Sequence, residues 1–155
     1  MAITIDKAIP VHLKDCVKAL LNSKLGEVYF KTKGAAQEYL KEGISSGEIY
    51  VALDSRYGCV GYAWFTMDGM FYKYPYLKNI AVKELHRGRG VGKKLLAFFE
   101  SCAFKQTDKV FLTAGDFNTK AQKLYKEVGY KKVGSIPNLF KQGYTEYLMI
   151  KSKGD

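Results

Sequence analysis

The chain has 155 residues, a length typical of one domain, and we expect residues 1–155 to form a single domain. Its 47% hydrophobic content predicts a packed core, and no apolar run approaches the ~20 residues of a membrane-spanning helix. The formal net charge of +10 comes from one part of the chain. Residues 1–70 hold eight Lys/Arg and eight Asp/Glu, whereas residues 71–155 hold seventeen and seven. We therefore expect the second part to bind an anion, either nucleic acid or a phosphorylated small molecule.

The N-terminus has no basic segment followed by a long apolar stretch, so we predict no secretory signal and expect the protein in the cytoplasm. Cys16, Cys59 and Cys102 are odd in number, and neither they nor His12 and His86 have the spacing of a zinc site. We interpret the cysteines as small buried apolar residues, and we predict no metal.

The first part of the chain predicts a strand, two helices and three antiparallel strands. These are a strand at 3–6, helices at 10–22 and 34–44, strands at 48–54 and 59–66, and a strand within 71–82. Gly58 belongs to a turn that makes the middle strands a hairpin, and Asp68-Gly69 indicates a second turn. Pro75 cannot donate to a strand ladder, so regular pairing is expected only after it.

The second part continues with alternating helices and strands. These are a helix at 91–105, a strand at 109–114, a helix from Asn118 to Gly129, and strands at 130–133 and 144–151. Asn118 is a good N-cap for its helix, and Gly129 is a good C-terminal stop. The sum predicts an α/β chain with a mixed sheet and helices on both faces.

A glycine-rich segment, Arg87-Gly88-Arg89-Gly90-Val91-Gly92, lies between the strand that ends at Val82 and the helix that follows. Glycines permit close backbone approach, and the first N–H groups of a helix lack internal partners, so this segment suits a phosphate group. A Walker loop is excluded because Lys94, not Ser or Thr, follows Gly92-Lys93. The dinucleotide pattern is excluded because Lys93 stands where a third glycine is required. The alternative is an ordinary turn with solvated arginines.

The two motifs of this region resemble those of the GNAT family of N-acetyltransferases. In that family Gln or Arg, two residues, Gly, one residue, and Gly or Ala form the core motif, which Arg87, Gly90 and Gly92 match here. A second signature is matched at Asn118, Ala121, Leu124, Tyr125, Gly129 and Tyr130. The resemblance covers nearly the whole chain and implies the GNAT fold, a mostly antiparallel sheet with one splayed parallel pair.

The resemblance implies that acetyl-coenzyme A (acetyl-CoA) is the acetyl donor. The strand around Ile80 would pair with the pantetheine arm, and the amides of the glycine segment would hold the pyrophosphate. The implied cofactor-binding residues are Ile80, Ala81, Val82, Arg87, Gly88, Arg89, Gly90, Val91, Gly92, Lys93, Asn118 and Tyr125. For Asn118, a role as a simple helix N-cap is an equal alternative.

The resemblance also implies that Tyr125 is the general acid that protonates the departing thiolate, because a phenol keeps its proton at neutral pH. Spacing alone would make it a core aromatic residue. The family's usual basic carboxylates are replaced here by Tyr76 and Thr113. Asp116, Glu27, or a water chain ordered by Tyr76 are substitutes, although both carboxylates also suit a solvated surface.

The expected reaction is direct transfer of an acetyl group to a primary amine of a small molecule or peptide in a ternary complex. Residues 25–33 and 135–143 would form the acceptor site, with Glu27, Tyr29, Phe30 and Phe140. The expected partners are acetyl-CoA and an amine acceptor, a homodimer is allowed, and neither nucleic acid nor a membrane is favoured. Two alternatives remain: a basic nucleic-acid-binding module without catalysis, and a GNAT domain that binds coenzyme A but is inactive.

Overall fold

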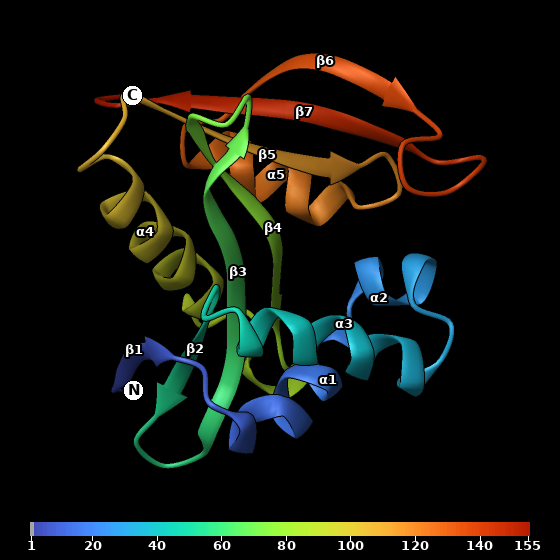
Figure 1. Cartoon of the computed structure of the whole chain (residues 1–155), viewed down its shortest axis with the longest axis vertical. Coiled ribbons are helices and arrows are strands. Elements are labelled where there is room, and N and C mark those ends of the chain that lie inside the picture. The colour runs from blue at the N-terminus through green and yellow to red at the C-terminus, as the bar shows by residue number, and fades with distance from the viewer. Residues whose placement is uncertain (1) are drawn as a thin grey trace. The chain divides into compact units, whose positions relative to one another are not determined.

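A computed structural model describes residues 2–155, which form both helices and strands (Figure 1). In chain order the elements are β1 (Ile3–Lys7), the 3-10 turn η1 (Pro10–His12), α1 (Leu13–Leu21), α2 (Lys24–Tyr29), α3 (Lys33–Ser45), β2 (Ile49–Asp54), β3 (Gly58–Met70), β4 (Tyr74–Val82), the 3-10 turn η2 (Glu84–His86), α4 (Val91–Ala103), β5 (Lys109–Gly115), α5 (Thr119–Glu127), β6 (Lys131–Pro137) and β7 (Thr145–Ser152). The predicted α/β class is confirmed.

The strands form a seven-stranded mixed sheet in the order β1-β2-β3-β4-β5-β7-β6. Strands β4 and β5 pair in parallel at Tyr76↔Phe111 and Leu77↔Leu112, whereas β1–β2, β2–β3, β5–β7 and β6–β7 are antiparallel. The predicted mixed sheet with one parallel pair is therefore confirmed, while the splay of that pair stays a prediction.

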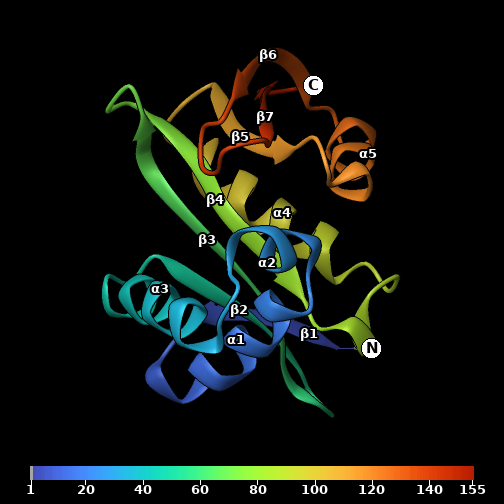
Figure 2. The same ribbon diagram turned by 90° about the vertical axis from the view of Figure 1, so that its right-hand side faces the viewer.

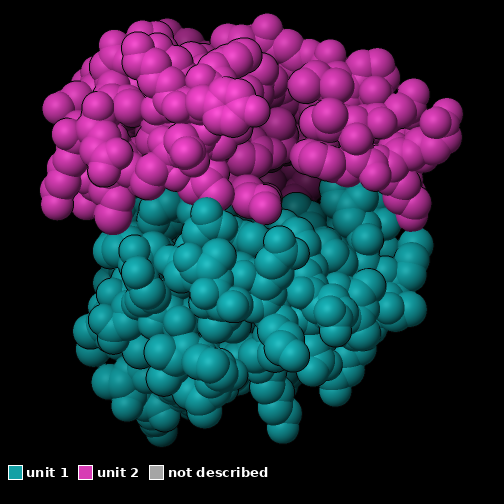
Figure 3. Space-filling view, viewed as in Figure 1, with its two compact units in different colours: residues 1–65, 79–99 teal, residues 66–78, 100–155 magenta. Residues whose placement is uncertain are grey.

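The chain divides into two compact units, coloured separately in Figure 3. Unit 1 comprises residues up to 65 together with 79–99, and unit 2 comprises residues 66–78 and 100–155. Strands β3 and β4 and helix α4 each contribute residues to both units. Our expectation of a single domain stays a prediction.

Helices cover both faces of the sheet within unit 1. Helices α1 and α3 pack side by side on one face, where Leu20 and Leu40 are fully buried (Figure 2). Tyr50 points to the opposite face, because side chains alternate along a strand. There its ring lies 4.9 Å from that of Phe98 on α4, measured between centroids.

The turn between β2 and β3 is stabilised by the Asp54 carboxylate, which accepts a hydrogen bond from the Arg56 N–H. This hydrogen bond lowers the pKa of Asp54.

Unit 2 is built on strands β5, β7 and β6 with helix α5, and its core includes Val110, Leu112 and Met149. A partly buried ion pair stabilises it: Lys151 Nζ lies 2.8 Å from Glu100 Oε1, and the Tyr130 hydroxyl donates to Glu100 Oε2 at 2.9 Å. The pKa of Tyr130 is raised by burial and by the neighbouring carboxylate.

The turn predicted at Asp68-Gly69 is wrong. Strand β3 continues through both residues to Met70, and the chain reverses at Phe71 and Tyr72, which adopt positive φ values of 58° and 57°. Gly69 serves close approach instead, because a Cβ there would lie 2.3 Å from Thr66 Oγ1 and 2.9 Å from Tyr76 Cβ. A glycine next to aspartate therefore marked a crowded strand position rather than a turn.

Two of the three cysteines meet in unit 1. Cys16 on α1 and Cys59 on β3 are both buried, and a hydrogen bond between their thiols raises the pKa of Cys16 and lowers that of Cys59. Cys102 is half-buried. Burial was expected for all three thiols, which holds for Cys16 and Cys59 but only in part for Cys102, and the contact between Cys16 and Cys59 was not expected.

Candidate active site

The glycine segment connects β4 to α4 within unit 1. Gly88 and Gly90 have positive φ values of 75° and 83°, a conformation that costs other residues free energy. A Cβ added to either residue would have no neighbour within 4 Å, so backbone conformation and not crowding requires these glycines. Helix α4 begins at Val91, and Lys94 N donates to the Gly90 carbonyl at 3.0 Å. The N–H groups before Lys94 are thus those that a helix start leaves for an anion.

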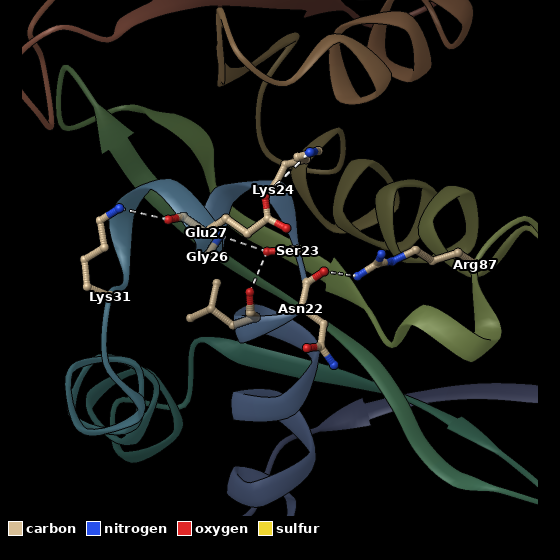
Figure 4. A network of polar contacts seen from close by, with 8 residues as sticks. Asn22, Ser23, Lys24, Gly26, Glu27, Lys31 and Arg87 are labelled. Carbon is tan, nitrogen blue, oxygen red and sulfur yellow. Dashed lines mark hydrogen bonds and ion pairs between the residues drawn. The ribbon is translucent and has the colours of Figure 1, made fainter.

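The Arg87 side chain binds two main-chain carbonyls, one of which, that of Asn22, is drawn in Figure 4. Its Nε donates to the Val82 carbonyl at 2.9 Å and its Nη2 to the Asn22 carbonyl at 2.8 Å. Arg87 therefore ties the end of β4 to the residue that follows α1. Arg89, the other predicted arginine, is exposed.

The residues predicted to pair with the cofactor arm form the end of β4. Ala81 is buried in the core on the α1 and α3 side, and alternation places Ile80 and Val82 on the other face. Strand β3 approaches closely here, because a Cβ on Gly61 would lie 2.8 Å from the Ala81 carbonyl oxygen. The backbone of Ala81 and Val82 is consequently fixed from one side.

Helix α2 overlaps the acceptor segment expected at residues 25–33, but no helix was expected there from the sequence. Its N-cap Ser23 accepts from Gly26 N at 3.0 Å and donates to the Leu20 carbonyl at 2.6 Å (Figure 4). Gly26 permits this packing, since a Cβ would lie 1.9 Å from the Leu20 oxygen. Glu27 pairs with Lys24 at 3.5 Å, with both side chains mostly exposed. Glu27 is thus a surface acid, as is the exposed Asp116.

In unit 2 the second motif forms helix α5. Asn118 is the N-cap, and its Oδ1 accepts from Ala121 N at 3.3 Å, so the capping role is confirmed. Tyr125 is 5% exposed, and its ring packs edge-on against Tyr130 with centroids 5.9 Å apart. Burial is the largest cause that raises the pKa of Tyr125, followed by Tyr76 and Glu146. The phenol therefore keeps its proton at neutral pH, as a proton donor must.

The two positions that lack a carboxylate contact each other. The Tyr76 hydroxyl lies 3.0 Å from Thr113 Oγ1, and either can donate. The structure also reveals Glu146, a carboxylate on β7 that is only 3% exposed. Sequence reasoning missed Glu146 because one acidic residue in a strand usually faces solvent.

The basic residues of unit 2 include two that line a small hollow. Lys126 and Lys132, with Gln122, Tyr147 and Met149, border a space of about 130 Å³, and Lys132 Nζ lies 3.8 Å from the centre of the Tyr147 ring.

Residues 2–155 include no group of three or more His, Cys, Asp or Glu side chains suited to a metal ion. In the same residues, no helix combines the length and apolar character needed to cross a membrane.

Comparison with known proteins finds related sequences. An N-alpha-acetyltransferase RimI of Mycobacterium tuberculosis is 32% identical over 108 residues, which cover 68% of this chain and 67% of that protein. An uncharacterized protein of Mycobacterium leprae is 33% identical over 116 residues, or 74% of this chain, but the match spans only 32% of that protein.

Solved structures share the fold over the full length. A GNAT acetyltransferase of Bacillus cereus superimposes with a TM-score of 0.80 at 21% identity, and Ard1 of Thermoplasma volcanium with 0.79 at 22%, each covering 100% of both chains. The family model described as "Acetyltransferase (GNAT) family" matches residues 18–130, which include the glycine segment, Tyr125 and Tyr130. The chain therefore belongs to the GNAT family of acetyltransferases.

Proposed function

We propose that the protein transfers the acetyl group of acetyl-CoA to a primary amine of a small molecule or peptide. The observation that carries the proposal is the glycine segment, where Gly88 and Gly90 hold positive φ angles directly before a 13-residue helix. This arrangement presents main-chain N–H groups to an anion of the size of a pyrophosphate. The positive charge of residues 71–155 supports the same ligand.

The cofactor would be held by main-chain and side-chain groups of both motifs. Residues 87–93 would bind the pyrophosphate, and the exposed Arg89 would add a charge-assisted hydrogen bond. Ile80, Ala81 and Val82 would pair with the pantetheine arm, and Asn118 would contact that arm in addition to capping α5. Arg87 would act indirectly, because its guanidinium holds the Val82 and Asn22 carbonyls.

The reaction would be a direct transfer without a covalent enzyme intermediate. The amine nitrogen attacks the acetyl carbonyl carbon, a main-chain amide near Val82 polarises that carbonyl, and the carbon–sulfur bond breaks. Tyr125 protonates the thiolate, a role that its burial and raised pKa support. The likeness to an N-alpha-acetyltransferase and to Ard1 favours a peptide N-terminus among the candidate acceptors.

Calorimetric titration with acetyl-CoA tests the proposal at the glycine segment. Gly90→Val should abolish binding, because a branched side chain cannot hold the positive φ of 83°. Gly58→Val is the matched control, since Gly58 also has a positive φ of 75° and open space, but is the first residue of β3, directly after the β2–β3 turn. It should lower stability while leaving affinity unchanged. A Gly90→Val variant that binds like the wild type would overturn the cofactor site.

Mass spectrometry of acetylated products, over a panel of amines, peptides and aminoglycosides, tests the reaction. One alternative, an inactive domain that binds coenzyme A, is favoured by the hydroxyls of Tyr76 and Thr113 where carboxylates are usual. It predicts binding without any acetylated product. The other alternative, a nucleic-acid-binding module, predicts salt-sensitive binding of DNA or RNA and no effect of acetyl-CoA on thermal stability.

A further inference from the structure

Glu146 is a carboxylate buried within unit 2. It is 3% exposed and is the second residue of β7, close to the loop that joins β6 to β7. A carboxylate removed from water loses hydration free energy, which the groups around it must offset. Asp54, the other buried carboxylate among residues 2–155, has N–H groups of the β2–β3 turn as its partners. The face of the sheet that carries Glu146 also carries the side-chain hydroxyls of Tyr76 and Thr113, which can transfer protons.

Strand register places Glu146 beside the hydroxyl pair. Glu146 lies opposite Gly115 and Leu148 lies opposite Thr113 in the antiparallel β5–β7 ladder. Directly paired residues share a sheet face, so Glu146 and Thr113 are diagonal neighbours on one face, within reach of a long side chain. Tyr76 is on that face as well, because it pairs with Phe111, and its hydroxyl lies 3.0 Å from Thr113 Oγ1.

Two of these residues, Tyr76 and Glu146, lie within electrostatic range of the proposed general acid. Besides burial, Tyr76 and Glu146 are the groups that raise the pKa of Tyr125, so both are within electrostatic range of its phenol. Tyr76, Thr113, Tyr125 and Glu146 all belong to unit 2. One compact unit therefore holds a proton donor, two linked hydroxyls and a carboxylate.

We propose that Glu146 is the general base for the acceptor amine and that the Tyr76–Thr113 pair relays the proton to it. The inference rests on the proposed acetyl transfer and supplies the base that the sequence lacked. An alkylammonium must lose a proton before its nitrogen can attack, and neither hydroxyl is basic enough to accept it at neutral pH. A carboxylate at the end of a hydroxyl relay meets that need.

A proton moves from the ammonium to Glu146 in three transfers. The ammonium gives one proton to the Tyr76 oxygen, Tyr76 passes its own to Thr113, and Thr113 passes its own to the Glu146 carboxylate. The nitrogen–carbon bond then forms, the carbon–sulfur bond breaks, and the thiolate takes the Tyr125 proton. The second proton of the attacking nitrogen returns to the Tyr125 phenolate. Glu146 releases its proton to solvent between turnovers, so the products are the amide, the thiol and one proton.

Two acceptors that differ in basicity test this role. One is a peptide with an N-terminal glycine, and the other is the same peptide with an aminooxyacetyl group in its place, whose amine is uncharged at pH 7. Glu146→Gln should lower kcat/KM about 100-fold for the glycyl peptide, the range of general base catalysis, and less than about threefold for the aminooxy peptide. Acetyl-CoA affinity should not change. A merely structural role would lower both rates equally.

Further variants keep the inference testable if Glu146→Gln folds poorly. Thr113→Val should show the same selective loss, and Thr113→Ser should restore the rate because it keeps the hydroxyl. Thr113→Val combined with Glu146→Gln should be no worse than either alone, as expected for one relay. Glu100→Gln is the control, because Glu100 is a carboxylate of unit 2 engaged with Lys151 and Tyr130. It should leave the ratio of the two rates unchanged.

The outcomes separate this inference from the proposed function. A wild type that acetylates the peptide, with a Glu146→Gln variant that is equally active or equally impaired on both acceptors, overturns the base alone. A wild type that acetylates neither acceptor overturns transfer to peptides, and the base with it.

Discussion

The proposed functional groups of the two units are encoded in different ways. In unit 1 the glycine segment is one continuous stretch, and its proposed anion binding would use main-chain N–H groups whose placement depends on the positive φ of Gly88 and Gly90. In unit 2 Tyr76, Thr113, Tyr125 and Glu146 come from β4, β5, α5 and β7, and only strand register and burial bring them into one group. A main-chain site can therefore be recognised in a sequence, whereas a side-chain site of this kind requires the fold.

The largest expected effect tests the side-chain chemistry of unit 2. Tyr125→Phe should lower kcat about 100-fold or more while acetyl-CoA affinity stays within about threefold, because only proton donation is lost. Steady-state kinetics at saturating cofactor measure this effect. Tyr130→Phe is the control, since Tyr130 is an equally buried phenol that donates to Glu100. Unchanged turnover of Tyr125→Phe would remove Tyr125 from the acid role.

A glycine of unit 1 provides the next largest effect. Gly26→Ala should lower the free energy of unfolding by about 2–3 kcal/mol, because its Cβ would lie 1.9 Å from the Leu20 oxygen and α2 would have to shift. Urea denaturation measures the change. Gly34→Ala is the control in α3, where a Cβ has no neighbour within 4 Å, and it should be neutral or slightly stabilising. Equal stabilities of the two variants would contradict the packing of α2 against α1.

Arg87 tests whether a side chain can act on a main-chain site. Arg87→Gln should weaken acetyl-CoA binding about tenfold, because it removes the fork that holds the Val82 and Asn22 carbonyls. Arg89→Gln should also weaken binding, but its effect should shrink as salt rises, because Arg89 would act on the phosphates by charge, whereas Arg87, which is also exposed, holds main-chain carbonyls. Calorimetry at two salt concentrations separates the two arginines. The same salt dependence for both would show that Arg87 acts by charge alone.

The smallest effect concerns alkaline pH. Burial raises the pKa of Tyr62, Tyr125 and Tyr130 above the phenol value of about 10. Above that pH the unfolded chain ionises first and binds fewer protons than the folded one, so stability present below pH 10 is lost as pH rises. Tyr130→Phe should reduce the loss between pH 9 and 10.5 by about 1 kcal/mol. Tyr72→Phe, at a 95% exposed phenol, should not.

Most elements of the fold were predictable because their signals are local. Asn118 caps α5 as expected, and the β2–β3 hairpin turns at Gly58. Helix α2 was missed because it has only six residues, and its Ser23 cap and its Gly26 contact depend on packing against α1. The turn at Phe71 and Tyr72 was missed because aromatic residues seldom adopt positive φ.

The site was predictable only where motifs are contiguous. The family motifs named the glycine segment, Asn118 and Tyr125, and comparison with the family pattern identified Tyr76 and Thr113 as departures. Nothing in the sequence linked Glu146 to Thr113, because a diagonal pair depends on the β5–β7 register. The partners of Arg87 were equally hidden, since main-chain carbonyls carry no sequence signal.

The contact between Arg87 and the Asn22 carbonyl has a consequence for how the protein can diverge. Because the acceptor atom belongs to the main chain, residue 22 can change identity without loss of the hydrogen bond. In the segment that follows, exposed residues such as Glu27 can therefore vary while Arg87 keeps its acceptor, whereas Ser23 and Gly26 are constrained by their contacts with Leu20. Under the proposed function, a change of acceptor preference at such exposed positions would leave the proposed acetyl-donor site intact.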